Sequence, residues 1–194
     1  MTVSQSCFFV SLYSFSLDKM NKYLFLLFLF VGEGFASCTQ TNINVNLLKQ
    51  AEDCVESYPD SALHLLHLLE HPERLHGKEG ADYALLLTQA LDKNYLDSLQ
   101  SDSLIKIAVE YYRGSDDKVK RGKACYYYGK TMAVKRKVSD AMEAYLEALA
   151  VLKETTEYKL QGLLSEHIGY LNLGQGMPEQ SIDCLLYTSP SPRD

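Results

Sequence analysis

The stretch that decides the fold is Gly122–Thr155, which reads GKACYYYGKTMAVKRKVSDAMEAYLEALAVLKET. It holds two helical patterns joined by a short polar turn. In the first pattern, residues spaced by three and four share one helical face: Cys125, Tyr128 and Met132. The second pattern repeats this spacing in Ala141, Tyr145, Ala148 and Leu152. Small residues, among them Gly129, lie where the two helices would have to approach closely, so the stretch predicts a helical hairpin.

This hairpin resembles a tetratricopeptide repeat (TPR), a family of helical hairpins with a period of about 34 residues. Counted from Gly122, four residues match the small and aromatic positions of the family: Gly129, Ala141, Tyr145 and Ala148. Three residues depart from its pattern, since Cys125 replaces a tryptophan, Met132 replaces a tyrosine and Lys153 replaces a proline.

A second copy of the pattern follows in Gly162–Leu185. It supplies a small residue in each helix and a glycine at the turn between them: Gly169, Ser181 and Gly176. Gly169 lies 40 residues after Gly129, about six more than the family period. We therefore predict that the helix starting near Ser139 runs on through Tyr158.

The chain before these copies is also helical by pattern. A helix runs from Leu47 to Tyr58, and Pro59 starts the next one. Ser101 is the expected N-cap of a later helix. We predict that its buried side consists of Leu104, Ile107, Ala108 and Tyr111. Residues 47–186 thus predict an all-α domain of about eight helices, whose antiparallel hairpins stack as a TPR-like right-handed superhelix, an α-solenoid.

Residues 1–37 have the order of segments typical of an export signal, with Met20 as the expected biological start. Lys22 is followed by an apolar run, Tyr23–Val31, which is shorter than the roughly 20 residues that span a bilayer. Phe35-Ala36-Ser37-Cys38 resembles a bacterial lipobox, which implies that Cys38 carries lipid and that residues 38–46 form a tether. An ordinary signal peptide or an uncleaved signal anchor is the alternative.

The last residues, 187–194, depart from the helical pattern, because Pro190 and Pro192 interrupt it. They resemble translated adapter sequence, and we expect the natural protein to be interrupted near 184–186. A genuine disordered C-terminus is the alternative.

The 194 residues are 46% hydrophobic and 23% charged, with a formal net charge of −6, which is typical of a globular domain. The segment from Lys118 to Lys137 is rich in basic residues and also contains three tyrosines, Tyr126 to Tyr128. Interleaved bases and aromatics can bind nucleic acid. An acidic, exported chain disfavours that partner, so no nucleic-acid partner is expected.

Metal binding has one candidate cluster in the sequence, made of His64, His67, His71 and His76. The five cysteines are scattered and contain no CxxC pair, and a closed zinc site usually takes four ligands. We therefore interpret the histidines as a solvated helix face, and we predict no metal site and no cofactor.

The TPR resemblance implies that a partner lies along the first helices of successive hairpins. It assigns Lys123, Tyr126 and Lys130 to the groove in one hairpin and Glu166 and Tyr170 in the next. The lysine and asparagine set of TPRs that bind chaperone tails is absent, so the ligand class is not implied.

The motifs of serine hydrolases, zinc proteases and nucleotide-binding loops are absent from the sequence. We expect a binding protein without catalysis or a small-molecule substrate. It would be lipid-anchored in the bacterial cell envelope, facing the periplasm or the exterior, and would bind a protein or peptide. The alternatives are the sensor portion of a truncated membrane signalling protein and, with less support, a metal-binding lipoprotein.

Overall fold

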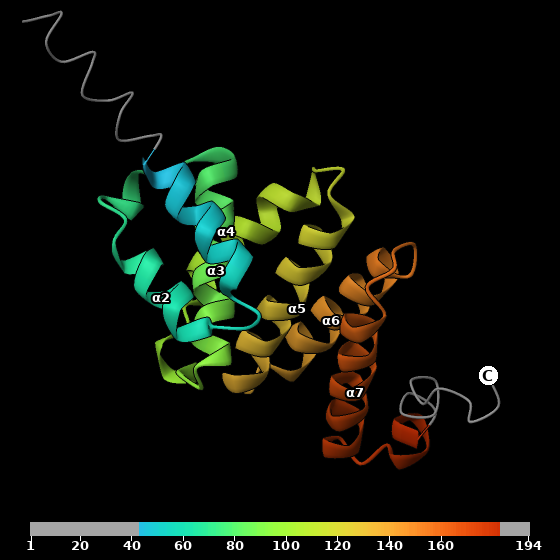
Figure 1. Cartoon of the computed structure of the whole chain (residues 1–194). Coiled ribbons are helices and arrows are strands. Elements are labelled where there is room, and N and C mark those ends of the chain that lie inside the picture. Colours follow the sequence, from blue (N-terminus) through green and yellow to red (C-terminus); the bar gives the residue numbers. More distant parts are fainter. Residues whose placement is uncertain (1–42, 183–194) are drawn as a thin grey trace, which may run out of the picture. The chain divides into compact units, whose positions relative to one another are not determined.

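The computed structural model describes residues 43–182, and Figure 1 shows them as coloured ribbons. They contain eight helical segments and no strand, which confirms the all-α prediction. Residues 43–54 and 178–182 are the outer segments. The others are α2 (Pro59–His67), α3 (Gly77–Lys93), α4 (Asp102–Arg113), α5 (Lys118–Val134), α6 (Val138–Leu152) and α7 (Tyr158–Gly174), with short 3-10 turns η1 (Pro72–Arg74) and η2 (Asp97–Leu99).

Each helix from α2 to α7 packs against the next one in the chain, and the α5–α6 pair has the most extensive contact. Helix α3 also contacts α5 directly, although α4 lies between them in the chain. We call the segment 43–54, α3, α5 and α7 the first helices, because each opens a hairpin, and α2, α4 and α6 the second helices. Figure 1 shows the α5–α6 hairpin between α3 and α7.

The predicted close approach of α5 and α6 is confirmed at Gly129. A Cβ atom on this glycine would lie 2.5 Å from Cε1 of Tyr145 and 3.3 Å from the carbonyl oxygen of Ala141. The predicted stripe of α6 is fully buried: Ala141, Tyr145, Ala148 and Leu152. Glycine is thus required at this crossing because the Tyr145 ring occupies the space of a side chain.

Two groups of buried side chains form the core. The first lies among 43–54, α2 and α3, and includes Leu48, Ala51, Val55, Ala62, Leu66 and Ala90. The second extends from α3 to α7, and includes Leu85, Ile105, Tyr112, Met132, Tyr145 and Leu164. Helix α3 contributes to both groups, with Leu86 in the first and Leu85 in the second.

Several predicted helix ends are confirmed. Pro59 occupies the first turn of α2. The Ser101 side chain caps α4 by accepting a hydrogen bond from the Leu104 amide at 3.3 Å. Helix α7 ends at Gly174, and Gly176 takes a φ of +75°, which suits glycine at that turn.

The predicted buried side of α4 is confirmed at Ala108, and Leu104 is partly buried against the core, but the prediction is wrong at Ile107 and Tyr111. Ile107 and Tyr111 are exposed, whereas the buried residues are Ile105, Ala108, Val109 and Tyr112. Both sets have helical spacing, so periodicity alone does not separate them. The Tyr112 hydroxyl decides between them, since it donates a hydrogen bond to the buried Asp82 of α3.

The predicted extension of α6 to Tyr158 is also wrong, since α6 ends at Leu152. The carbonyl oxygen of Leu152 accepts hydrogen bonds from the Thr155 hydroxyl and the Gln161 amide, both at 2.8 Å. These side chains replace the next helical turn. The 40-residue spacing instead consists of α5, the three-residue turn 135–137, α6 and the five-residue stretch 153–157.

The first helix starts earlier than predicted, since residues 43–46 are helical although they fall in the segment expected to be a tether. Gln50 donates a hydrogen bond to the Asn46 side chain at 3.2 Å, one helical turn apart. The lipidation residue Cys38, the signal segment 1–37 and the tail 187–194 lie outside the described residues. Within 43–182, no helix combines the length and apolar character needed to cross a bilayer.

Candidate functional site

The five predicted groove residues lie on two neighbouring first helices, α5 and α7. Tyr170 is 58% exposed, and Lys123, Lys130 and Glu166 are half-buried. Tyr126 differs from the prediction, since it is only 4% exposed and therefore presents little surface to a partner. We call the five residues, together with Asp92 and His167, the groove face.

Tyr126 is buried because α7 covers it. Its hydroxyl shares a hydrogen bond with Nε2 of His167 at 3.1 Å. The imidazole also stacks on Tyr145, with ring centroids 5.4 Å apart and an interplanar angle of 23°. Burial, and next the charge of Lys130, lower the pKa of His167 below its ordinary value, so the imidazole is neutral near pH 7. These rings join α5, α6 and α7.

His167 was missed by sequence reasoning, although one signal pointed to it. It lies 40 residues after Tyr127, so it takes the place that a tyrosine holds in the preceding hairpin. The sequence favours that tyrosine as packing between neighbouring hairpins. A residue in the corresponding position of the next copy is expected to have the same role.

Lys130 is held between two groups on the groove face. Its Nζ lies 2.6 Å from Oδ1 of Asp92 on α3, and 5.9 Å from the centroid of the Tyr126 ring. A cation over an aromatic face is attracted by the ring quadrupole. Asp92 thus holds the Lys130 side chain in place, and this ion pair joins α3 to α5. Asp92 was not identified as a site residue from the sequence.

A second ion-pair network joins three first helices around Asp82 of α3. Lys120 of α5 lies 2.6 Å from Asp82 and 2.8 Å from Glu52 of the 43–54 helix. Lys78 and the Tyr112 hydroxyl also donate to the Asp82 carboxylate. Burial alone would raise the pKa of Asp82, but the hydrogen bonds from Lys120, Lys78 and Tyr112 lower it below its ordinary value. The carboxylate is therefore charged and fully engaged.

Another negative charge that links the first helices belongs to Glu56, just after the 43–54 helix. Its carboxylate accepts a hydrogen bond from Gln89 at 2.6 Å and pairs with Lys93 at 2.8 Å. Burial opposes ionisation of Glu56, but Lys93, followed by Lys123 and Lys159, lowers its pKa. The charge of Lys123 thus acts on the Glu56 carboxylate, while its side chain stays half-buried.

Most basic residues of the segment 118–137 are used in ion pairs between helices. Arg121 pairs with Glu147 at 3.3 Å, and Lys135 and Lys137 pair with Asp102 at 2.6 and 3.5 Å. Lys118 also pairs with Glu154. These charges hold α5 and the turn 135–137 to neighbouring segments, which gives the basic segment a structural role.

The four clustered histidines do not come together. His64 and His67 are exposed on α2, and His71 and His76 are exposed in the following loop. Nδ1 of His71 shares a hydrogen bond of 3.1 Å with Oε1 of Glu73. Within residues 43–182, no group of three or more histidine, cysteine, aspartate or glutamate side chains is arranged to hold a metal ion.

No model of a known protein family, no curated protein and no solved structure matches the chain. The resemblance to TPR hairpins therefore stays a prediction that rests on the residues quoted above.

Proposed function

We propose that the chain is a TPR-like scaffold that binds a protein or peptide partner along its first helices, without catalysis. In this proposal the hairpins stack as a right-handed superhelix. The exposed part of the groove face, with Lys123, Glu166 and Tyr170, contacts the partner.

One observation carries the proposal, namely that the first helices contact one another directly. Lys120 connects α5 to the 43–54 helix through Glu52 and to α3 through Asp82. Tyr126 connects α5 to α7 through His167. Side-by-side first helices are what stacked hairpins require, and they give a continuous, rigid surface. A partner bound on such a surface loses its own freedom but orders little of the scaffold.

The chemistry of the face favours a polypeptide over a small molecule. Tyr170 offers a large exposed aromatic surface, and aromatic side chains are enriched in protein interfaces. Glu166 adds a negative charge one helical turn before Tyr170 on α7, and Lys123 adds a positive charge on α5. A surface with both charges and an aromatic residue matches an extended peptide with both polar and apolar side chains.

The proposal places this scaffold in a bacterial envelope, tethered by lipid on Cys38. Intact mass and membrane partition of the full chain, expressed in a Gram-negative host, test this part. We expect a mature mass that begins at Cys38 with added lipid, and its loss in Cys38→Ala. An unprocessed mass that the substitution leaves unchanged would remove the tether from the proposal.

Partner binding is tested by selecting peptides from a random library against the full chain. We expect the selected peptides to bind Lys123→Glu and Tyr170→Ala about tenfold more weakly, which is the scale of an interface hot spot. Leu68→Ala is the matched control, because Leu68 is a comparably exposed residue (53%) at the end of the second helix α2. Peptides that bind Tyr170→Ala as tightly as the unaltered chain would exclude the groove face as the binding surface.

A further inference from the structure

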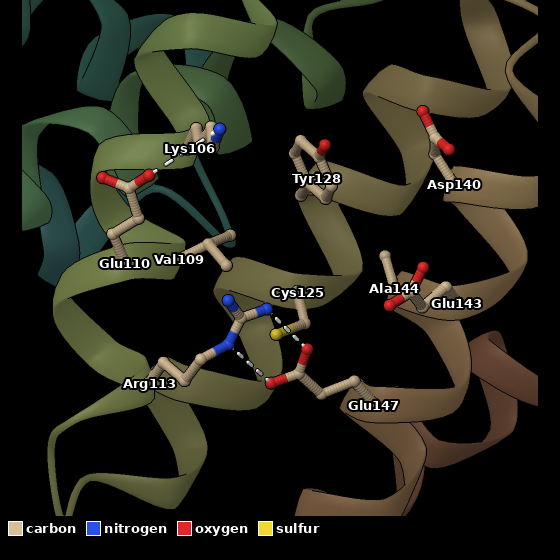
Figure 2. Close-up of a pocket in the computed structure, with 10 residues that line it drawn as sticks. All are labelled: Lys106, Val109, Glu110, Arg113, Cys125, Tyr128, Asp140, Glu143, Ala144 and Glu147. Carbon is tan, nitrogen blue, oxygen red and sulfur yellow. Dashed lines mark hydrogen bonds and ion pairs between the residues drawn. The ribbon is translucent and has the colours of Figure 1, made fainter.

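A pocket of about 290 Å³ lies between α4, α5 and α6, as Figure 2 shows. Helix α5 contributes Cys125 and Tyr128 to it. Tyr128 follows Tyr126 by two residues, and each residue turns an α-helix by about 100°. The pocket therefore opens on the side of α5 opposite to the groove face.

Buried side chains form the base of this pocket, and exposed charged side chains form its rim. Val109, Cys125 and Ala144 line the base and are at most 6% exposed. Burial raises the pKa of the Cys125 thiol to about 12, so this group is neutral and adds to the apolar base. The half-buried Tyr128 ring forms one wall.

The rim has more negative than positive charge. Four lining residues are acids and two are bases. Arg113 is held by Glu147 through two hydrogen bonds of 3.2 and 2.8 Å, and Lys106 lies 3.8 Å from Glu110. Asp140 and Glu143 of α6 make no ion pair with any residue in 43–182. Figure 2 shows both carboxylates beside the pocket without a dashed line.

We propose that this pocket binds an arginine side chain of a polypeptide partner. The aliphatic stem of arginine would pack on the base, and the guanidinium group would lie between the Tyr128 ring and the carboxylates of Asp140 and Glu143. Guanidinium groups stack on aromatic rings and pair with carboxylates, and they are more weakly hydrated than ammonium groups. The charge complementarity therefore selects a basic side chain, and the aromatic wall favours arginine over lysine.

Size and surroundings favour a side chain over a free ligand. Pockets for small molecules have volumes of roughly 300 to 1,000 Å³, and this one is at the lower limit, which suits one side chain. The helices on either side also expose apolar residues, Ile107 at 46% on α4 and Leu146 at 51% on α6. The rest of a polypeptide would find apolar contacts there. This site is distinct from the groove face, so an experiment that excludes binding at one of the two surfaces does not exclude binding at the other.

The test is a titration of the full chain, labelled with ¹³C at alanine and valine methyl groups and followed by NMR. The probe is N-acetyl-arginine methylamide, and its comparator is N-acetyl-citrulline methylamide, which has nearly the same shape but no charge. We expect saturable shifts of the Val109 and Ala144 methyl resonances with the arginine probe and none at Ala62 in α2. The citrulline comparator should bind about fivefold more weakly than the arginine probe, because it lacks the charge that pairs with the carboxylates and the Tyr128 ring.

Two substitutions locate the effect. Glu143→Gln and Tyr128→Leu should each weaken the arginine probe, whereas Asp53→Asn, at an exposed acid on the 43–54 helix, should leave it unchanged. Equal binding of arginine and citrulline, or shifts that neither substitution reduces, would overturn the proposal. Saturable binding of spermidine without binding of the arginine probe would also overturn it, since the occupant would then be a free polyamine.

Discussion

At the scale of single residues, Gly129 and Gly162 provide a matched pair. A Cβ atom at Gly129 would lie 2.5 and 2.6 Å from two atoms of the Tyr145 ring, whereas one at Gly162 in α7 would meet nothing within 4 Å. Gly129→Ala should therefore lower the free energy of unfolding by about 1–3 kcal/mol through overpacking. Gly162→Ala should raise it by about 0.5–1 kcal/mol, because glycine is a poor helix former.

Chemical denaturation of the full chain, with both variants beside the unaltered protein, measures this difference. The opposite signs are the informative result, since the two substitutions are chemically identical. If Gly129→Ala were as stable as Gly162→Ala, α5 and α6 would not approach as closely as the structure has them.

At the scale of elements, we expect the docking of α7 on α5 to depend on a neutral His167, which contacts Tyr126 and Tyr145. Burial and Lys130 lower the pKa of His167, while Glu166 and Asp92 oppose them. The unfolded chain takes up a proton near pH 6.5, where the folded chain does not. The unfolded state thus binds more protons. The contribution of His167 to the free energy of unfolding is therefore fully present above about pH 7 and is lost as the pH falls below about 6.5.

Hydrogen exchange of the α7 amides at pH 7.5 and 5.5, corrected for the intrinsic rates, measures this effect. We expect weaker protection at pH 5.5, and little change with pH in His167→Gln, which has no titrating group. Equal protection of α7 at both pH values would mean that His167 does not control its docking on Tyr126 and Tyr145.

The helices also differ in how well the sequence predicts which of their faces is buried. The stripe of α6 was predictable because Ala141, Tyr145 and Ala148 combine small and aromatic residues at one helical spacing. The buried side of α4 was not, because the Tyr112–Asp82 hydrogen bond joins residues 30 apart in sequence. Tyr126 was assigned to the groove for the same reason, since its partner His167 lies 41 residues further along. Periodicity defines a face, and only tertiary contacts decide what covers it.

At the scale of the whole molecule, the two core groups predict that the chain unfolds in parts. Leu66 belongs to the core group among 43–54, α2 and α3, and is 1% exposed. Leu66→Ala should cost about 2–5 kcal/mol through the cavity that it leaves. Because the helices contact mainly their neighbours in sequence, we expect this loss to stay close to its origin.

Native-state hydrogen exchange of the full chain tests this expectation. In Leu66→Ala, protection should fall in 43–54 and α2, while α5 and α6 keep most of theirs because their core residues, such as Tyr145 and Leu152, belong to the other group. Leu164→Ala, at a fully buried position in α7, is the matched control and should affect α7 and α6 more than α2. A uniform loss of protection in both variants would show one cooperative unit, in which α3 couples the two core groups too strongly for either to open alone.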